Sequence, residues 1–342
     1  MTTHRTDDTT LSRRHALGAG VALAAASLLP RSVRADDKAV PAREISPAPL
    51  PNGSGFYRFK LGELEVLSIG DGDGAIPPYP LVGENASQAE VEAALAADFL
   101  DTKSAAMAFN VPLARTPAGV VLFDAGNGVR GRGWGAGKLI DHMRNAGIAP
   151  ADVKAIVLTH LHGDHFGGLA SEDGSLVFPN ARYFLQKIEA DFWTGPAPDM
   201  SGSKADDATK KQFIEGAAKA FAAVKDRSEL IDGAKEIMPG VRLEPAYGHT
   251  PGHQVAHLSS GDKQLLLIAD CIHHHCLSLR HPEWHLRFDT DATKGAETRK
   301  RMLDRCAADK ALVLAYHMPF PGVGHVRREG TGFEWVAAAW KW

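Results

Sequence analysis

Between His160 and His165 the chain places three histidines and one aspartate within six positions, directly after the apolar run AIVLT. An apolar run of this kind predicts a buried strand, and the Gly-Gly pair after Phe166 indicates a turn behind the histidines. Imidazoles gathered at the end of a strand are typical of metal ligands rather than of a tail or a purification tag. The sequence therefore predicts a fold in which a buried strand is followed directly by a metal-binding loop.

Three more loops carry a histidine or an aspartate directly after an apolar strand pattern. His249 follows VRLEPA, Asp270 follows QLLLIA, and His317 follows ALVLAY. Because strand ends on one edge of a sheet converge, we expect the four loops to line one cavity. Imidazole and carboxylate ligands suit Zn, Fe, Mn or Co better than Ca. The set of five histidines and two aspartates exceeds the needs of one tetrahedral ion, so we expect two ions that share a bridging carboxylate.

The alternative is that these side chains are ordinary core or surface histidines, each satisfied by hydrogen bonds. That interpretation applies to the histidines that lack the strand-end position, namely His253, His257, His281, His285 and His325. Among them His253 lies nearest to the predicted ligands, because GHTPGH places it close behind His249.

The first 35 residues are predicted to be an export signal and no part of the fold. They contain an arginine pair after Ser12, then a mildly apolar Ala/Leu/Gly segment, then the small-residue cleavage site VRA at 33–35. This order resembles a twin-arginine signal, which implies a periplasmic or secreted protein. A disordered basic N-terminus or an uncleaved anchor is the alternative. Residues 36–54, rich in Pro and Ala, are predicted to form a linker or arm.

From residue 55 to 342, strand and helix patterns alternate in two loosely similar halves. FYRFKLGELEVLSIGDG predicts a hairpin around Gly62, GKLIDHMRNAGI predicts a helix that ends on Gly147, and residues 292–309 predict a further helix. This order predicts an α/β fold, with two mixed sheets packed face to face and helices outside. The net charge of −3 indicates no basic surface for nucleic acid, and the body of the chain has no apolar run of membrane-spanning length.

The pattern THLHGDH resembles the HxHxDH motif of the metallo-β-lactamase superfamily, and the order of the three downstream ligands matches as well. The resemblance covers about residues 55–342 and implies one hydrolase domain with the αββα sandwich fold. It also implies that Asp124, in LFDAG, supports the ligand loops through hydrogen bonds. Two ion sites with Asp270 as the bridge are implied, one formed by His160, His162 and His249, the other by Asp164, His165 and His317.

The chemistry expected of such a site is metal-assisted hydrolysis. Two divalent ions, zinc in preference to Mn, Fe or Co, are expected to hold a hydroxide that attacks an ester carbonyl or a phosphoryl centre. Asp164 is expected both to bind metal and to orient that hydroxide. The chain has no GxSxG motif, so no serine nucleophile is expected. The predicted substrate is a lactone, a carboxylic ester or an organophosphate ester.

Residues of the substrate pocket are predicted from resemblance to two groups within the superfamily. EADFW, GHTPGH and HMPFPGVGH resemble methyl parathion hydrolases, which implies Trp193 in an aromatic pocket, although KIEADFW also has the spacing of a core helix. Trp134, in the Gly-rich loop after Asp124, is expected to line another wall. Three residues past Asp270, where acyl-homoserine lactonases carry tyrosine, the chain has His273, which is expected to polarise a carbonyl or protonate a leaving alkoxide. This departure favours lactones and esters over phosphotriesters.

The rest of the segment CIHHHC has no role that the sequence assigns. His274 and His275 have no assigned role, and the alternative for His273 to His275 together is that they are partly exposed loop residues. A separate site with Cys271 and Cys276 as ligands is disfavoured, because Asp270 already fills the ligand role. The three cysteines of the chain are an odd number, which excludes complete pairing in disulfides.

Two other functions compete with the leading prediction: an organophosphate triester hydrolase proper and a non-catalytic periplasmic metal-binding module. A β-lactam hydrolase is disfavoured, because the β-lactamases of the closest types lack the full arrangement of Asp164, His165 and His317. A hydrolase of glutathione thioesters is disfavoured, because export separates the protein from that substrate. The expected partner is a small-molecule ester or lactone, with neither nucleic acid nor a membrane after signal cleavage. A homodimer is expected, with the arm at 36–54 packing across it.

Overall fold

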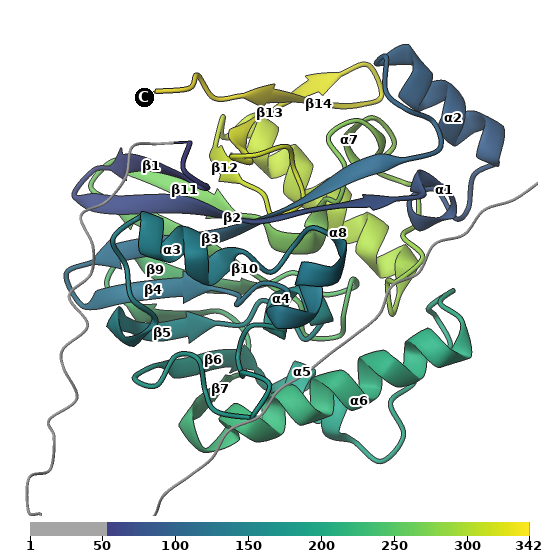
Figure 1. The fold of residues 1–342 in the computed structure, drawn as a ribbon. Helices are drawn as coiled ribbons and strands as arrows, with labels where there is room; N and C mark the ends of the chain where they lie inside the picture. Colours follow the sequence, from purple (N-terminus) through teal and green to yellow (C-terminus); the bar gives the residue numbers. More distant parts are fainter. Residues whose placement is uncertain (1–52, 342) are drawn as a thin grey trace, which may run out of the picture. The chain divides into compact units, whose positions relative to one another are not determined.

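The computed structural model describes residues 53–341, so the predicted export signal and almost all of the predicted arm lie outside the described residues. Two seven-stranded sheets form the centre of the described chain (Figure 1). The first contains, in spatial order, β1 (Phe56–Leu61), β2 (Leu64–Ile76), β3 (Ala105–Thr116), β4 (Gly119–Phe123), β5 (Val153–Val157), β6 (Arg182–Gln186) and β7 (Ser228–Ile231).

The second sheet is built from the C-terminal half of the chain. In spatial order it contains β14 (Gly332–Ala337), β13 (Val323–Glu329), β12 (Leu312–Leu314), β11 (Lys263–Leu267), β10 (Gln254–Ser260), β9 (Val241–Pro245) and β8 (Lys235–Met238). Both sheets are mixed: β4 to β7 run parallel in the first, and β11 pairs with β12 in parallel in the second. The prediction of two mixed sheets is confirmed.

Helices cover the outer faces of the sheets and the end at which the ligand loops lie. The α-helices are α1 (Pro78–Leu81), α2 (Gln88–Ala97), α3 (Leu139–Asn145), α4 (Gly163–Phe166), α5 (Lys187–Thr194), α6 (Asp207–Val224), α7 (Leu277–Arg280) and α8 (Ala292–Ala308). The 3₁₀ helices are η1 (Val129–Trp134), η2 (Pro150–Asp152), η3 (Lys225–Arg227) and η4 (Ala269–Cys271). Helix α3 ends just before Gly147, whose φ of 72° suits glycine, as predicted. Within residues 53–341 no helix has both the length and the apolarity that crossing a bilayer requires.

Alternation along the strands creates two different cores on the two faces of the first sheet. Val66 and Val157 point between the sheets, where they join Leu258 of the second sheet in one buried cluster. Their strand neighbours Leu67 and Ile156 point the other way, into the cluster under the helices. Successive strand residues face opposite sides of a sheet, so fully apolar strands such as AIV are buried on both faces.

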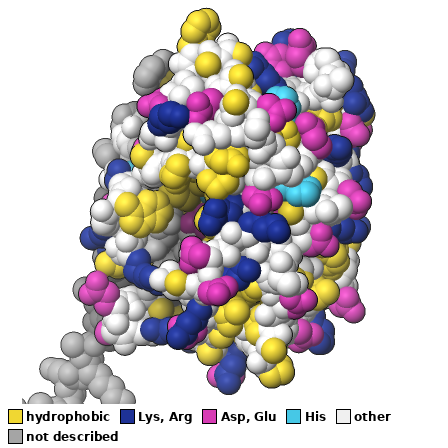
Figure 2. Space-filling view, turned by 90° about the vertical axis from the view of Figure 1, so that its right-hand side faces the viewer, with side chains coloured by type: hydrophobic (Ala, Val, Ile, Leu, Met, Phe, Trp, Pro, Cys, Tyr) yellow, Lys and Arg dark blue, Asp and Glu magenta, His cyan; other side chains and the backbone are white. Residues whose placement is uncertain are grey.

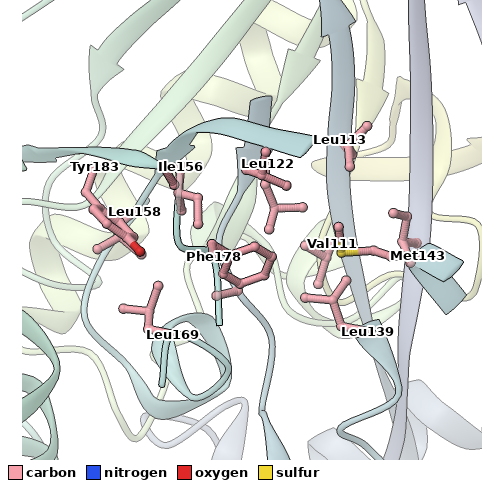
Figure 3. Packing of buried hydrophobic residues seen from close by; sticks show 14 of the residues in the cluster. Val111, Leu113, Leu122, Leu139, Met143, Ile156, Leu158, Leu169, Phe178 and Tyr183 are labelled. Atoms are coloured by element: carbon pink, nitrogen blue, oxygen red, sulfur yellow. The ribbon is translucent and has the colours of Figure 1, made fainter. Parts of the chain in front are cut away.

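The outer core of the first sheet joins its strands to α3, as the close view shows (Figure 3). Leu139 and Met143 of α3 lie against Val111 and Leu113 of β3 in this cluster. On the second sheet, α8 supplies a matching set of buried apolar residues, Met302, Leu303 and Cys306. The sandwich therefore has three apolar layers, and polar side chains collect at its ends.

The four predicted ligand loops meet at one end of this sandwich. The loop after β5 leaves the first sheet, whereas those after β9, β11 and β12 leave the second. The expectation that they share one edge of one sheet is therefore wrong in detail. They converge because the two sheets pack face to face with these strand ends side by side.

Both signs of charge are present on one face of the molecule (Figure 2). On the face shown in Figure 2, Lys and Arg side chains are interspersed with Asp and Glu, and no continuous basic area forms.

Candidate metal centre

The first ligand set consists of His160, His162 and His249. His160 and His162 lie in the loop from β5 to α4, and His249 lies in the loop after β9. One nitrogen from each of the three rings lies within 4.8 Å of the others. The Nδ1 atom of His162 is 2.9 Å from Nε2 of His249. These three buried imidazoles aim at a common point.

The second ligand set consists of Asp164, His165 and His317. Asp164 and His165 lie in the single turn of α4, and His317 follows β12. The Oδ2 atom of Asp164 is 3.4 Å from Nε2 of His165 and 3.6 Å from Nε2 of His317. A carboxylate and two imidazoles thus face one another.

Asp270 contacts both ligand sets. Its Oδ2 atom is 3.4 Å from Nε2 of His249 in the first set and 3.1 Å from Nε2 of His317 in the second. Its Oδ1 atom is 3.2 Å from Nε2 of His165. A carboxylate in this position can bind two ions at once, as the sequence predicted from the excess of ligands.

The polar atoms of the centre match what metal ions require. Nε2 of His160, Nε2 of His165 and Oδ1 of Asp270 are buried and have no hydrogen-bond partner among the described residues. Such atoms are rare unless an ion or water satisfies them. Burial lowers the pKa of His160 well below its usual value, which keeps the imidazole in the neutral form that binds metals. Burial alone would raise the pKa of Asp270, but His165 and His317 hold it well below its usual range, so the carboxylate is ionised.

Asp124 lies where its predicted supporting role requires. One of its oxygens, Oδ2, is 2.8 Å from Nδ1 of His165 and also accepts from the Thr159 hydroxyl. The other, Oδ1, accepts from the Thr159 backbone N–H at 2.7 Å. A carboxylate behind a metal-binding imidazole fixes the tautomer and the orientation of the ring. Asp124 therefore holds His165 with its Nε2 atom toward Asp270.

His253 is buried and satisfied, in agreement with the structural interpretation, but it is close to the centre. Its Nδ1 donates to the Ala246 carbonyl at 2.9 Å, and its Nε2 accepts from the Asp270 backbone N–H at 3.1 Å. Burial lowers the pKa of His253 to about 3, so the ring is neutral and can accept that bond. His253 thereby positions the backbone of the bridging aspartate.

Three supporting residues were not predicted. Asp289 accepts from Nδ1 of His249 at 2.7 Å, and the Tyr316 hydroxyl donates to the Asp164 carbonyl at 2.7 Å. Glu189, on α5, binds backbone groups of two ligand loops. None of them is a histidine or aspartate directly after an apolar strand pattern, which is how the ligands were predicted. For Tyr316, its position just before the predicted ligand His317 could have indicated that it lies near the centre.

His273 lies inside the centre. Its Nε2 atom is 3.0 Å from Oδ2 of Asp270, and its ring stacks on that of His317 with 5.0 Å between centroids. The interpretation of His273 to His275 as exposed loop residues is wrong for His273 and His274, which are each 6% exposed. The Nδ1 atom of His274 accepts from the N–H groups of Cys276 and Leu277, so His274 shapes the start of α7.

The cysteines take no part in the centre. All three are free and buried, and burial raises the pKa of the Cys276 thiol to about 12. The groups of potential metal ligands found among the described residues contain only histidine and aspartate. A site with Cys271 and Cys276 as ligands is therefore not formed.

The implied substrate role of Trp193 does not fit its position. The indole is 1% exposed and belongs to the outer core of the first sheet. Its Nε1 donates to Glu189 at 2.7 Å, and its ring meets His162 only edge-on, at 5.9 Å. The alternative interpretation, that KIEADFW has the spacing of a core helix, is confirmed. Helix α5 directs the Trp193 side chain into the core behind the first ligand set.

Other aromatic residues flank the two ligand sets. Trp134, at the end of η1, is 50% exposed. It meets Phe109 edge-on at 5.5 Å, and Phe109 meets His317 at the same centroid distance. On the other side, Phe213 of α6 lies 4.9 Å from His162. Trp134 thus reaches the second ligand set only through Phe109, and Phe213 lies directly beside the first; the expected contact of Trp134 with substrate stays a prediction.

Fold and site together define a two-sheet α/β protein with donor groups for two metal ions between its strand ends. The chain matches the model of the metallo-beta-lactamase superfamily over residues 110–317. It therefore belongs to the metallo-beta-lactamase superfamily, and the family resemblance of THLHGDH is confirmed.

Two solved structures resemble nearly the whole described chain. AidC, a dizinc quorum-quenching lactonase in complex with a product, is 32% identical, with a TM-score of 0.81; the alignment covers 84% of this chain and 98% of that one. A hydrolase of the beta lactamase superfamily, AbOPH, is 28% identical, with a TM-score of 0.77 and the same coverage of both chains. The predicted αββα sandwich is thus confirmed.

Curated relatives match a shorter part. An N-acyl homoserine lactonase of Bacillus cereus is 25% identical over 131 residues, which are 38% of this chain and 43% of the relative. The chain thus spans less than half the length of that relative. The prediction of a metal-dependent enzyme that hydrolyses ester bonds agrees with the named activities of these relatives.

Proposed function

We propose that the protein is a dinuclear metallohydrolase that opens lactones and cleaves related carboxylic esters, with zinc as the metal. The observation that carries the proposal is the position of Asp270, whose two oxygens lie 3.1–3.4 Å from nitrogens of both ligand sets. When bound, two such ions supply a hydroxide at neutral pH and polarise the oxygen of the bond to be cleaved. The dizinc lactonase and the N-acyl homoserine lactonases among the relatives favour lactones as the substrate class.

Other residues of the centre would orient the attacking oxygen, contact the substrate and form the apolar wall of the pocket. Asp164, about a quarter exposed, is the least buried carboxylate of the centre and is placed to orient the attacking oxygen. His273 faces the centre through Nε2, 3.0 Å from Oδ2 of Asp270, so we assign it the substrate carbonyl or the leaving alkoxide. Trp134 and Phe109 offer an apolar wall beside the second ligand set.

An organophosphate triester hydrolase remains the second candidate, because a two-ion centre can attack a phosphoryl group as well as a carbonyl. The aromatic flank formed by Trp134 and Phe213 suits an aryl leaving group as well as an acyl chain. His273 favours the first candidate, because a hydrogen-bond donor near the leaving group assists an alkoxide more than a stabilised phenolate.

The test is a substrate panel on zinc-loaded protein with metal analysis on the same samples. We expect two zinc ions per chain and faster hydrolysis of an N-acyl γ-lactone than of p-nitrophenyl acetate or paraoxon. Asp270→Asn should lose both metal and activity. His273→Ala should keep its zinc and lose at least about tenfold in lactone turnover, whereas His285→Ala, outside the centre, should match the unaltered protein.

Several outcomes would redirect the assignment. Two bound ions without turnover of any substrate would favour the non-catalytic metal-binding module. Paraoxon as the fastest substrate, with His273→Ala unchanged, would favour the phosphotriesterase. Loss of zinc in His273→Ala would make His273 a ligand, since its Nε2 lies close to both His249 and Asp270.

A further inference from the structure

Glu189 is a fully buried carboxylate that the proposed reaction does not use. It lies in the first turn of α5 and is 0% exposed. Burial raises its pKa, and hydrogen bonds from the surrounding donors act in the opposite direction. An ionised group in the interior is costly unless its oxygens are satisfied. The donors that satisfy it therefore indicate why it is there.

Two of these donors belong to the two loops of the first ligand set. The backbone N–H of Leu161, between His160 and His162, donates to Oε1 at 2.8 Å. The backbone N–H of Gly252, just behind His249, donates to Oε2 at 2.7 Å. One carboxylate thus connects a loop of the first sheet to a loop of the second.

The remaining donors hold the carboxylate itself in place. Trp193 Nε1 donates to Oε1 and the Thr250 hydroxyl donates to Oε2, both at 2.7 Å. Each oxygen therefore accepts two hydrogen bonds, one from backbone and one from a side chain. Gly252 is required for this approach, because a Cβ atom there would lie 2.5 Å from the backbone nitrogen of Glu189.

We infer that Glu189 is a positioning residue for the first ion site, which it builds by tying the His160–His162 loop to the His249 loop. The distance that it controls is the one between Nδ1 of His162 and Nε2 of His249, now 2.9 Å. Glutamate is needed rather than glutamine because all four partners donate hydrogen. A carboxamide would turn an NH₂ group toward two of them and release one loop.

The inference rests on the proposed function in that the centre must bind metal. The experiment compares Glu189→Gln with the unaltered protein by equilibrium dialysis against a zinc buffer, and by the visible spectrum after cobalt loading. Glu215→Gln, on the exposed face of α6, replaces a carboxylate by a carboxamide away from the centre and is the control for that substitution. Phe178→Leu, a buried residue of the same outer core, controls for lost stability.

Glu189→Gln should fold, as judged by circular dichroism, and bind one of its two zinc ions at least about tenfold more weakly. The cobalt spectrum should lose the bands of one site. Phe178→Leu should unfold at a lower temperature yet keep both ions, because a purely structural defect does not change affinity in the folded state. Two ions bound to Glu189→Gln with unaltered affinity would overturn the inference, whatever its melting temperature.

A second variant covers the case in which Glu189→Gln does not fold. Thr250→Val removes one donor to Oε2 and leaves the carboxylate in place, so the same ion should bind more weakly, by a smaller factor. Unaltered affinity in that variant would count against the inference. Absence of zinc from the unaltered protein would instead contradict the proposed function itself.

Discussion

Each imidazole of the centre has two nitrogens, and the one that faces away from the ions decides how well the ring binds. In His249 that nitrogen is Nδ1, which donates to the buried Asp289 at 2.7 Å. Asp289 is in turn 3.8 Å from the buried guanidinium of Arg299, which donates to the carbonyls of Cys271 and Trp284. Asp289 thus stands between the His249 ring and the Arg299 guanidinium and fixes the orientation of that ring.

Asp289→Asn should therefore weaken binding of one zinc ion by about 10- to 100-fold. The amide can present NH₂ to Nδ1 of His249, which reverses the tautomer and removes Nε2 as a ligand. Zinc titration with a competing chelator measures the effect. The exposed Asp262→Asn serves as the control, and equal affinity in the two variants would show that Asp289 has no part in metal binding.

Sequence reasoning found the residues of the centre that follow strands, and it failed for those that do not. His160, His249 and Asp270 stand directly behind apolar runs, so topology alone brings them together. Glu189 and Asp289 contact the centre from a helix and a loop, and only the packing of those segments on the ligand loops reveals them. The prediction that Trp193 lines the substrate pocket was wrong. It came from resemblance to other proteins, and resemblance does not show which face of α5 packs against the core in this chain.

At the scale of elements, α2 was not predicted, although its sequence contains a complete capping box. The Ser87 hydroxyl accepts from the Glu90 N–H, and the Glu90 carboxylate accepts from the Ser87 N–H. Val91 and Leu95 on its inner face pack against Leu277 of α7. The helix thereby supports the segment that leads away from His273.

Ser87→Ala should lower the free energy of unfolding by about 1 kcal/mol, the usual cost of losing a helix N-cap. Urea denaturation followed by circular dichroism measures the change. Ser87→Thr should be close to neutral, because its hydroxyl can make the same bond. A similar loss in both variants would mean that the cap does not stabilise α2.

The strands were predictable wherever apolar runs were long, and the shorter edge elements were not. The hairpin around Gly62 and the buried strand at Val153–Val157 appear as expected, because alternation and hydrophobicity determine them locally. The hairpin of β13 and β14 escaped prediction, since β13 ends in the charged run RRE and β14 is the edge strand of the second sheet. The export signal, the arm and the homodimer remain predictions.

At the scale of the whole molecule, the ions would join two sheets that pack through apolar side chains and are also linked by the Glu189 carboxylate and the Gln186–Gln254 hydrogen bond. The loop at His160–His165 belongs to the first sheet, and the loops of His249, Asp270 and His317 belong to the second. Without metal, the buried carboxylates and imidazoles of the ligand loops lack the positive ions that would bind them. Metal binding should thus stabilise the folded chain as a unit.

Removal of zinc with a chelator should lower the thermal unfolding midpoint, and zinc should restore it. Zinc at a hundred times its dissociation constant stabilises the folded state by about 2.7 kcal/mol per site. Calcium should not restore the midpoint, because a histidine-rich donor set suits it poorly. Differential scanning calorimetry gives the comparison; an unchanged midpoint after complete removal would mean that the two sheets hold together without the ions.

The ligands and the aromatic flanks of the centre lie on separate segments of the chain. His160 to His165 and Asp270 sit directly behind strands, whereas Trp134 ends the glycine-rich η1 and Phe213 lies on α6. Mutations can therefore accumulate in η1 and α6 while the metal-binding loops stay intact. On the proposed assignment of Trp134 and Phe213 to the substrate pocket, a new substrate preference needs no change in the metal-binding loops, and directed evolution aimed at η1 and α6 can exploit this separation.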